Sequence, residues 1–132
     1  LLANNLRAYA VTMLYGLIPF VRLPALALGV NAVLLGGLAA CYAATDTTML
    51  LYAASLLPHG IFELPALILA FSMGLYICGH LTRRCRRDPA ALPLGACLGL
   101  AARLLVFLLL PLLILAALTE AYVTPLAAGL FL

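Results

Sequence analysis

The stretch MLLYAASLLPHGIFELPALILAFSMGLYICGHL, residues 49–81, decides the fold. A membrane-spanning helix needs about 20 largely apolar residues, and this apolar run of 33 residues is too long for one span. Pro58, Gly60 and Pro65 interrupt its first half. Because proline disrupts a regular helix, we expect a short re-entrant or interfacial helix here, followed by a full span over about Phe62–Leu81.

The rest of the chain has the same apolar character. Hydrophobic residues make up 67% of the 132 residues, charged residues make up 8%, and the mean hydropathy is +1.24. A soluble domain carries about a quarter charged residues, so this composition indicates a protein that lies in a lipid bilayer. The other expected spans are Leu6–Phe20, Leu23–Ala44 and Leu94–Leu118, separated by a turn at Arg22 and Pro24, a polar loop at Ala44–Thr48 and the arginine-rich loop, with a short tail at Glu120–Leu132. The sequence therefore predicts one all-α domain over residues 1–132, a transmembrane bundle with about four spans.

Small residues recur at four-residue intervals along the predicted span Phe62–Leu81. They are Ala66, Ala70, Gly74 and Cys78. Such a stripe lets a neighbouring helix approach closely, and Gly95 with Gly99 predicts the same device on the following helix. These stripes are equally compatible with a monomer and with a homo-oligomer.

Arginines in one loop predict the orientation of the chain. They are Arg83, Arg84, Arg86 and Arg87. Loops rich in arginine stay in the cytoplasm, so we expect this loop to be cytoplasmic and to contact anionic lipid headgroups. Alternation then places Arg22 inside, and the Asp46 loop and the C-terminal tail outside. It also places Asn4 and Asn5 outside, so we expect a further span upstream of this chain.

On this topology, His59, Glu63, Glu120, Asn4 and Asn5 gather toward the external half of the membrane and could form one polar site. His59 and Glu63 are four residues apart and share a face of a helix. Ionisable groups at membrane depth mark either a functional site or an internal pair. The residues therefore allow three interpretations, namely bracing of a broken helix, a transport or proton-relay role, and a zinc hydrolase. The last is the weakest, because the two-histidine spacing of zinc proteases is absent and His80 lies at the opposite membrane face.

Other polar or reactive residues carry weaker signals. Asn31 lies near the middle of its span and needs a partner, whereas Arg103 can extend its side chain toward the interface. The four cysteines lack the spacing of a metal site or of a disulfide scaffold and are interpreted as packing residues. The sequence has no glycine-rich phosphate loop and no basic module with interleaved aromatic residues, so it predicts neither a cofactor nor nucleic-acid binding.

Four strings in the sequence resemble a known family. PHGIFELPA at Pro58–Ala66 is followed by the small-residue span, and the Asn4–Asn5 pair, Asn31 with Gly36, and EAYVTP at Glu120–Pro125 occur in the same order as in that family. The chain thereby resembles the stage II sporulation protein M family over nearly its whole length. One departure is Ala32, which follows Asn31 where the family pattern leads us to expect glycine.

The resemblance implies about five spans in the complete protein, the first of them an N-terminal anchor that this chain lacks. It also implies a role at the cell membrane in engulfment during sporulation, in which the protein holds the wall-degrading stage II sporulation proteins D and P. The function expected from the sequence is therefore a non-enzymatic scaffold for peptidoglycan remodelling. The alternative is a small transporter or channel-like subunit that uses the external His/Glu site.

Overall fold

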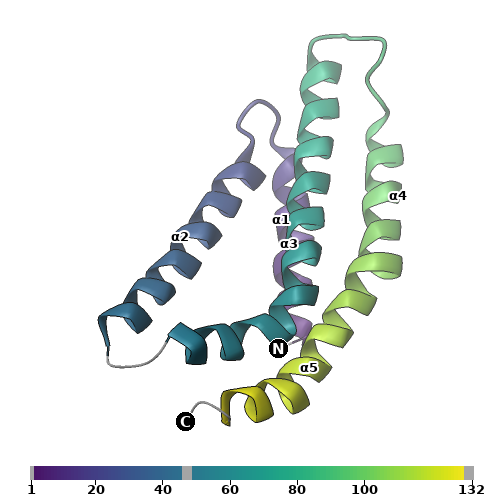
Figure 1. Cartoon of the computed structure of the whole chain (residues 1–132). Coiled ribbons are helices and arrows are strands. Elements are labelled where there is room, and N and C mark those ends of the chain that lie inside the picture. Colours follow the sequence, from purple (N-terminus) through teal and green to yellow (C-terminus); the bar gives the residue numbers. More distant parts are fainter. Residues whose placement is uncertain (1, 46–48, 130–132) are drawn as a thin grey trace.

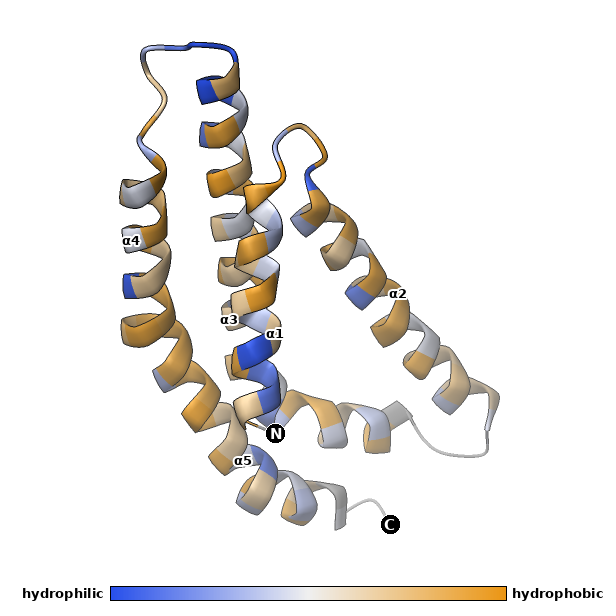
Figure 2. Ribbon diagram, turned by 180° about the vertical axis from the view of Figure 1, so that it is seen from behind, coloured by the Kyte–Doolittle hydropathy of each residue, from blue (hydrophilic) through white to orange (hydrophobic). Residues whose placement is uncertain are grey.

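The computed structural model describes residues 2–45 and 49–129, which fold into a bundle of helices. In chain order the elements are α1 (Leu2–Leu14), a 3-10 turn η1 (Tyr15–Leu17), α2 (Leu23–Ala44), α3 (Met49–Cys85), α4 (Leu94–Leu104), a π-helical turn η2 (Leu105–Leu109) and α5 (Leu110–Gly129). Within the described residues, three helices are long and apolar enough to cross a membrane, namely α2, α3 and the rod formed by α4, η2 and α5. The predicted all-α transmembrane bundle is confirmed, and Figure 2 shows the apolar colouring along most of each helix.

The first helix is shorter than the predicted span Leu6–Phe20. Helix α1 has 13 residues, and the backbone tightens into η1 directly after it. At 1.5 Å per residue, α1 extends about 20 Å, whereas the hydrocarbon core of a bilayer is about 30 Å thick. Helix α1 therefore reaches across only part of a bilayer and lies against α3 (Figure 1).

Helix α3 is bent but continuous. The predicted re-entrant segment and the span after it belong to one helix of 37 residues, with Pro58 and Pro65 inside it. In Figure 1 its first turns run almost across the direction of its remaining turns. Each proline removes one backbone N–H from the helix and crowds the preceding turn, which is the usual cause of a sharp bend. The prolines thus turn the helix without ending it.

The C-terminal helix extends further than predicted. We expected a span over Leu94–Leu118 and then a short tail, but α5 continues to Gly129 and carries Pro125 inside it. The tail prediction is therefore wrong for residues 120–129, while residues 130–132 and Asp46 lie outside the described residues. Within the rod, the Leu110 N–H bonds to the Leu105 carbonyl, a wide turn directly before Pro111 that accommodates the proline ring.

The core forms where α1, α4 and α5 pack on α3. Its buried residues are Tyr9, Met13, Ala66, Ala70, Met73, Ile77, Cys97, Ala101, Leu109 and Leu113. Helix α2 leans away from this core (Figure 1), and only 6% of its most apolar stretch is buried within the bundle. Exposed side chains such as Val33 on α2 and Phe107 on η2 are those expected to face lipid.

A close helix approach joins Gly16 of η1 to Gly74 of α3. A Cβ atom on Gly16 would collide with the Gly74 carbonyl oxygen, and one on Gly74 would lie 2.8 Å from both the Thr12 carbonyl oxygen and Pro24 Cγ. The whole predicted stripe on α3 is buried, which confirms its packing role. Gly95 and Gly99 are exposed, and a Cβ on either would meet nothing within 4 Å, so the prediction of a second packing stripe is wrong within this chain.

We predict that Gly74→Ala destabilises the protein by about 1–3 kcal/mol, because the new methyl group has no room against the α1–α2 segment. The matched control is Gly79→Ala, five residues further along α3, where a Cβ meets nothing within 4 Å. Thermal unfolding in detergent checks both variants. Equal transition temperatures for the two variants would contradict the close approach.

Candidate functional site

Three helices each contribute a pair of polar residues to one end of the bundle. The pairs are Asn5 and Tyr9 on α1, His59 and Glu63 on α3, and Glu120 and Thr124 on α5. Residues four apart lie on one face of a helix, so each pair points in a common direction. We call these six residues the polar cluster. The sequence predicted four of them together, Asn5, His59, Glu63 and Glu120.

Helix α1 is attached to α3 through Glu63. The Asn5 side-chain amide donates a hydrogen bond of 2.5 Å to Glu63 Oε1, and the Tyr9 hydroxyl donates one of 3.2 Å to the Glu63 backbone carbonyl. Tyr9 was not singled out from the sequence. The sequence nevertheless contained a signal for Tyr9, because it lies four residues after Asn5. Residues at that spacing share one face of a helix, and Asn5 is on the face that meets Glu63.

Helix α5 is attached to α3 through His59. Its Nδ1 lies 3.3 Å from Thr124 Oγ1, and the Thr124 hydroxyl lies 3.3 Å from the Thr119 carbonyl oxygen, to which it can donate. A hydroxyl has one proton, so when that proton is donated to Thr119, His59 Nδ1 must be protonated to donate to Thr124. The hydrogen bond of His59 therefore goes to another helix and not to Glu63, its predicted partner.

Glu120 differs from the other members of the cluster in its hydrogen bonding. Within residues 2–45 and 49–129, its Oε2 atom is buried and has no hydrogen-bond partner. The Glu63 carboxyl is close enough to interact electrostatically with both Glu120 and His59. Burying a polar atom without a hydrogen-bond partner costs free energy. A role in holding the helices together therefore does not explain why a carboxyl group occupies this position.

A pocket of about 240 Å³ opens between α1, α2 and α3 beside the cluster. The residues lining it include Asn5, Tyr9, Thr12, Asn31, Gly60 and Glu63. The Asn31 side-chain amide donates a hydrogen bond of 3.0 Å to the Ala27 carbonyl on its own helix, which meets one part of its need for partners. Thus Asn31 and Gly60, predicted from separate strings, do lie with Glu63 around one cavity.

Other predicted site residues stay apart from the cluster. Asn4 and Pro65 are exposed, and Pro58 is half-buried within α3 but does not line the pocket. His80 lies toward the other end of α3, where its Nδ1 accepts a hydrogen bond of 3.1 Å from the Leu92 N–H. Among the described residues, no group of three His, Cys, Asp or Glu side chains is placed to hold a metal ion.

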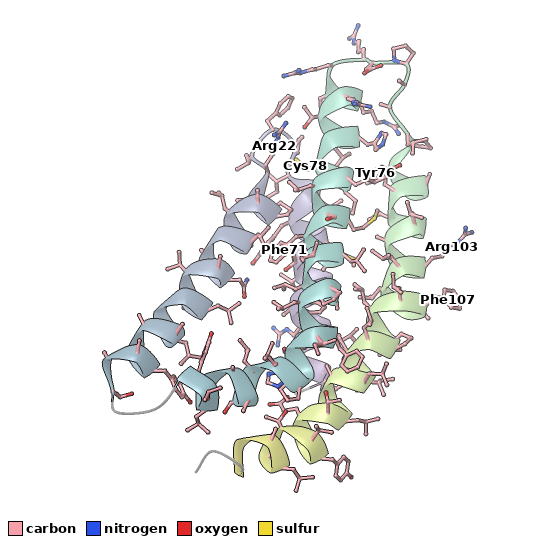
Figure 3. The ribbon with its side chains drawn as sticks, in the orientation of Figure 1. Arg22, Phe71, Tyr76, Cys78, Arg103 and Phe107 are labelled. Carbon is pink, nitrogen blue, oxygen red and sulfur yellow. The ribbon has the colours of Figure 1, made fainter. Side chains whose placement is uncertain are left out.

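The arginines of the loop after α3 occupy the opposite end of the molecule. The four that were predicted to set the orientation are exposed at the end of α3 and just after it, and Figure 2 shows this loop as strongly hydrophilic. Arg103 is exposed on α4, and its side chain points away from the bundle, as expected for a side chain that extends to the interface (Figure 3).

We predict that Tyr9→Phe lowers the free energy of unfolding by roughly 0.5–1.5 kcal/mol, because it removes only the hydroxyl that bonds to the Glu63 carbonyl. Tyr15→Phe is the matched control, since the Tyr15 ring is exposed and η1 lies directly after α1. Unfolding in detergent monitored by circular dichroism measures both. A loss in the control as large as in Tyr9→Phe would show that the Tyr9 bond contributes nothing specific.

Comparison with known proteins places the chain in a family. The family model described as Stage II sporulation protein M matches residues 1–125, which include all six residues of the polar cluster. No curated protein and no solved structure matches the chain. The match covers almost the whole length, and the membrane-spanning helices agree with it. The chain therefore belongs to the stage II sporulation protein M family and is a sporulation-related, multi-pass membrane protein.

Proposed function

We propose that this protein is a non-enzymatic membrane scaffold that recruits or positions cell-wall hydrolases in engulfment or a related envelope process. Family membership supports a role connected with sporulation. The proposed partners are extracytoplasmic hydrolases resembling stage II sporulation proteins D and P. The single observation that carries the scaffold proposal is that the polar cluster uses its side chains to hold helices together.

Three contacts favour bracing over chemistry. Glu63 accepts from Asn5, and its backbone carbonyl accepts from Tyr9, which joins α3 to α1. His59 contacts Thr124, which joins α3 to α5. An acid–base pair needs both groups within hydrogen-bond reach of one substrate atom, whereas these two side chains are each engaged with a different helix. The cluster therefore acts as a rigid joint.

The family string at Glu120–Pro125 divides into an inner and an outer face. Thr124 contacts His59, whereas the Tyr122 side chain is 69% exposed and its neighbour Val123 is also exposed. The inner face braces the helix, and the outer face remains available at the same end of the molecule. We propose that a hydrolase, or its membrane anchor, contacts this outer face.

The scaffold proposal requires the polar cluster to lie on the external side, and the arginine loop to lie in the cytoplasm. Two exposed cysteines test this sidedness, because Cys41 is in the last turn of α2 and Cys85 is the last residue of α3. In single-cysteine variants, a membrane-impermeant maleimide added to intact cells should label Cys41 and leave Cys85 unlabelled. Inverted vesicles should give the opposite result. Labelling of Cys85 in intact cells would overturn the proposed orientation.

We predict that crosslinking and pull-down from native membranes capture a cell-wall hydrolase with the wild-type chain. Tyr122→Ala should reduce capture at least severalfold at unchanged expression, because it changes the outer face and leaves the cluster intact. Phe107→Ala is the control, since Phe107 is 77% exposed on the same continuous rod but belongs to η2, well before the polar cluster. Glu63→Ala should instead reduce the amount of folded protein, because it removes the acceptor of the Asn5 side chain.

One observation favours a second function. Within the part of the chain that the structure describes, a buried oxygen of Glu120 has no partner, and it lies beside Glu63, which lines the neighbouring pocket. This arrangement suits a small transporter or channel-like subunit that moves a proton or cation. If the wild-type chain captures no hydrolase, and proteoliposomes dissipate a pH gradient in a manner abolished by Glu120→Gln, the transporter replaces the scaffold. Capture of a hydrolase together with absence of flux supports the scaffold.

A further inference from the structure

A second pocket lies at the arginine-rich end, where the turn between α1 and α2 meets the last turns of α3. Its volume is about 480 Å³, and the residues lining it include Phe20, Arg22, Gly79, Thr82, Arg83 and Arg86. Arg22 thus shares one pocket with two arginines that follow it by about sixty positions in the sequence. Figure 3 shows Arg22 close to Cys78, another lining residue, at this end of α3.

Three contacts hold the turn in place against α3. The Phe20 N–H donates a hydrogen bond of 3.0 Å to Thr82 Oγ1, and Cys78 Sγ donates one of 3.4 Å to the Ile18 carbonyl. The Arg86 guanidinium lies 5.8 Å from the centre of the Phe20 ring, within the range of a cation–π contact. Phe20 and Arg22 both have positive φ angles, which non-glycine residues seldom adopt, so the turn has a defined shape.

The pocket concentrates positive charge without a matching negative charge. Asp88 is the only acidic residue between Thr82 and Pro93; it does not line the pocket, and its Oδ1 accepts a hydrogen bond from the Ala90 N–H. The negative end of the α3 dipole favours arginines in its last turn, and this accounts for Arg83. It does not account for Arg22, which lies on another segment. Gly79 adds no side chain to the wall, and a Cβ there would meet nothing within 4 Å.

We propose that this pocket binds the phosphate group of an anionic phospholipid headgroup. Guanidinium groups pair with phosphate oxygens through two parallel hydrogen bonds, and several of them around one cavity form a specific phosphate site. The volume falls within the range of about 300–1,000 Å³ found for small-molecule pockets. Arg22, Arg83 and Arg86 bind the phosphate, and Thr82 and Phe20 shape the wall.

Apolar side chains beside the pocket point to a lipid as the source of the phosphate. Phe20 is 57% exposed and Val21 is 51% exposed, in the same turn that carries Arg22. A soluble phosphate compound gains nothing from these side chains, whereas a phospholipid places its acyl chains next to its headgroup. Arg84 and Arg87 carry equal charge in the same segment but do not line the pocket. The site is therefore separable from the general attraction of a basic loop to an anionic membrane.

Native mass spectrometry of the detergent-solubilised full chain, with equimolar phosphatidylglycerol and phosphatidylcholine, tests the proposal. The wild-type chain should retain phosphatidylglycerol preferentially, and Arg83→Gln/Arg86→Gln should lose the preference by about fivefold for each arginine removed. The double variant Arg84→Gln/Arg87→Gln removes the same amount of charge and should keep the preference for phosphatidylglycerol. Arg22→Gln should lose about fivefold, whereas Arg7→Gln, at the other end of the molecule, should have no effect.

Three results would overturn the site. They are an equal loss in the two double variants, no preference in the wild-type chain, and displacement of the lipid by millimolar inorganic phosphate or glycerol phosphate, which would make a soluble phosphate the ligand. Unfolding of each variant in phosphatidylcholine micelles serves as the folding control. If the Arg86 variant proves unstable because it loses the Phe20 contact, Arg22→Gln decides alone, since no side-chain hydrogen bond or ion pair of Arg22 is found within the described chain.

Discussion

The backbone contact between Gly16 and Gly74 is the constraint on which the rest of the structure depends. It brings the end of a short helix against the middle of a long one, at a separation that admits no side chain on either glycine. Because α1 is a rigid rod, this contact limits where both of its ends can lie. On one side it places Asn5 and Tyr9 over Glu63, and on the other it places the Phe20–Arg22 turn over the last turns of α3.

Polar groups in this protein follow the requirement that a bilayer imposes. Side chains that cannot reach water must find partners within the bundle, and the hydrogen bonds of Asn5, Tyr9 and His59 each tie one helix to another. The same requirement makes Glu120 informative, because its buried oxygen has no partner within the described chain. The polar cluster therefore joins α3 to both α1 and α5, and one of its carboxyl oxygens, Glu120 Oε2, has no hydrogen-bond partner within the described residues.

Composition and spacing alone determined the class of the protein. A run of apolar residues longer than one span, with Pro58 and Pro65 inside it, indicated a broken membrane helix, since the bilayer fixes the length and proline removes backbone donors. The spacing of His59 and Glu63 placed them on one face of that helix, and the stripe through Gly74 marked the face that packs. These features are local, so they can be read from the sequence without knowledge of the fold.

The tertiary structure decided which faces meet, because the rotation and tilt of each helix depend on packing across the whole bundle. It gave His59 the partner Thr124 in place of Glu63, and it joined Arg22 to arginines at the far end of α3. It also buried the stripe on α3 while Gly95 and Gly99 remained exposed, although both patterns look the same in the sequence. Small residues permit a close approach, but only a neighbouring helix in the right place produces one.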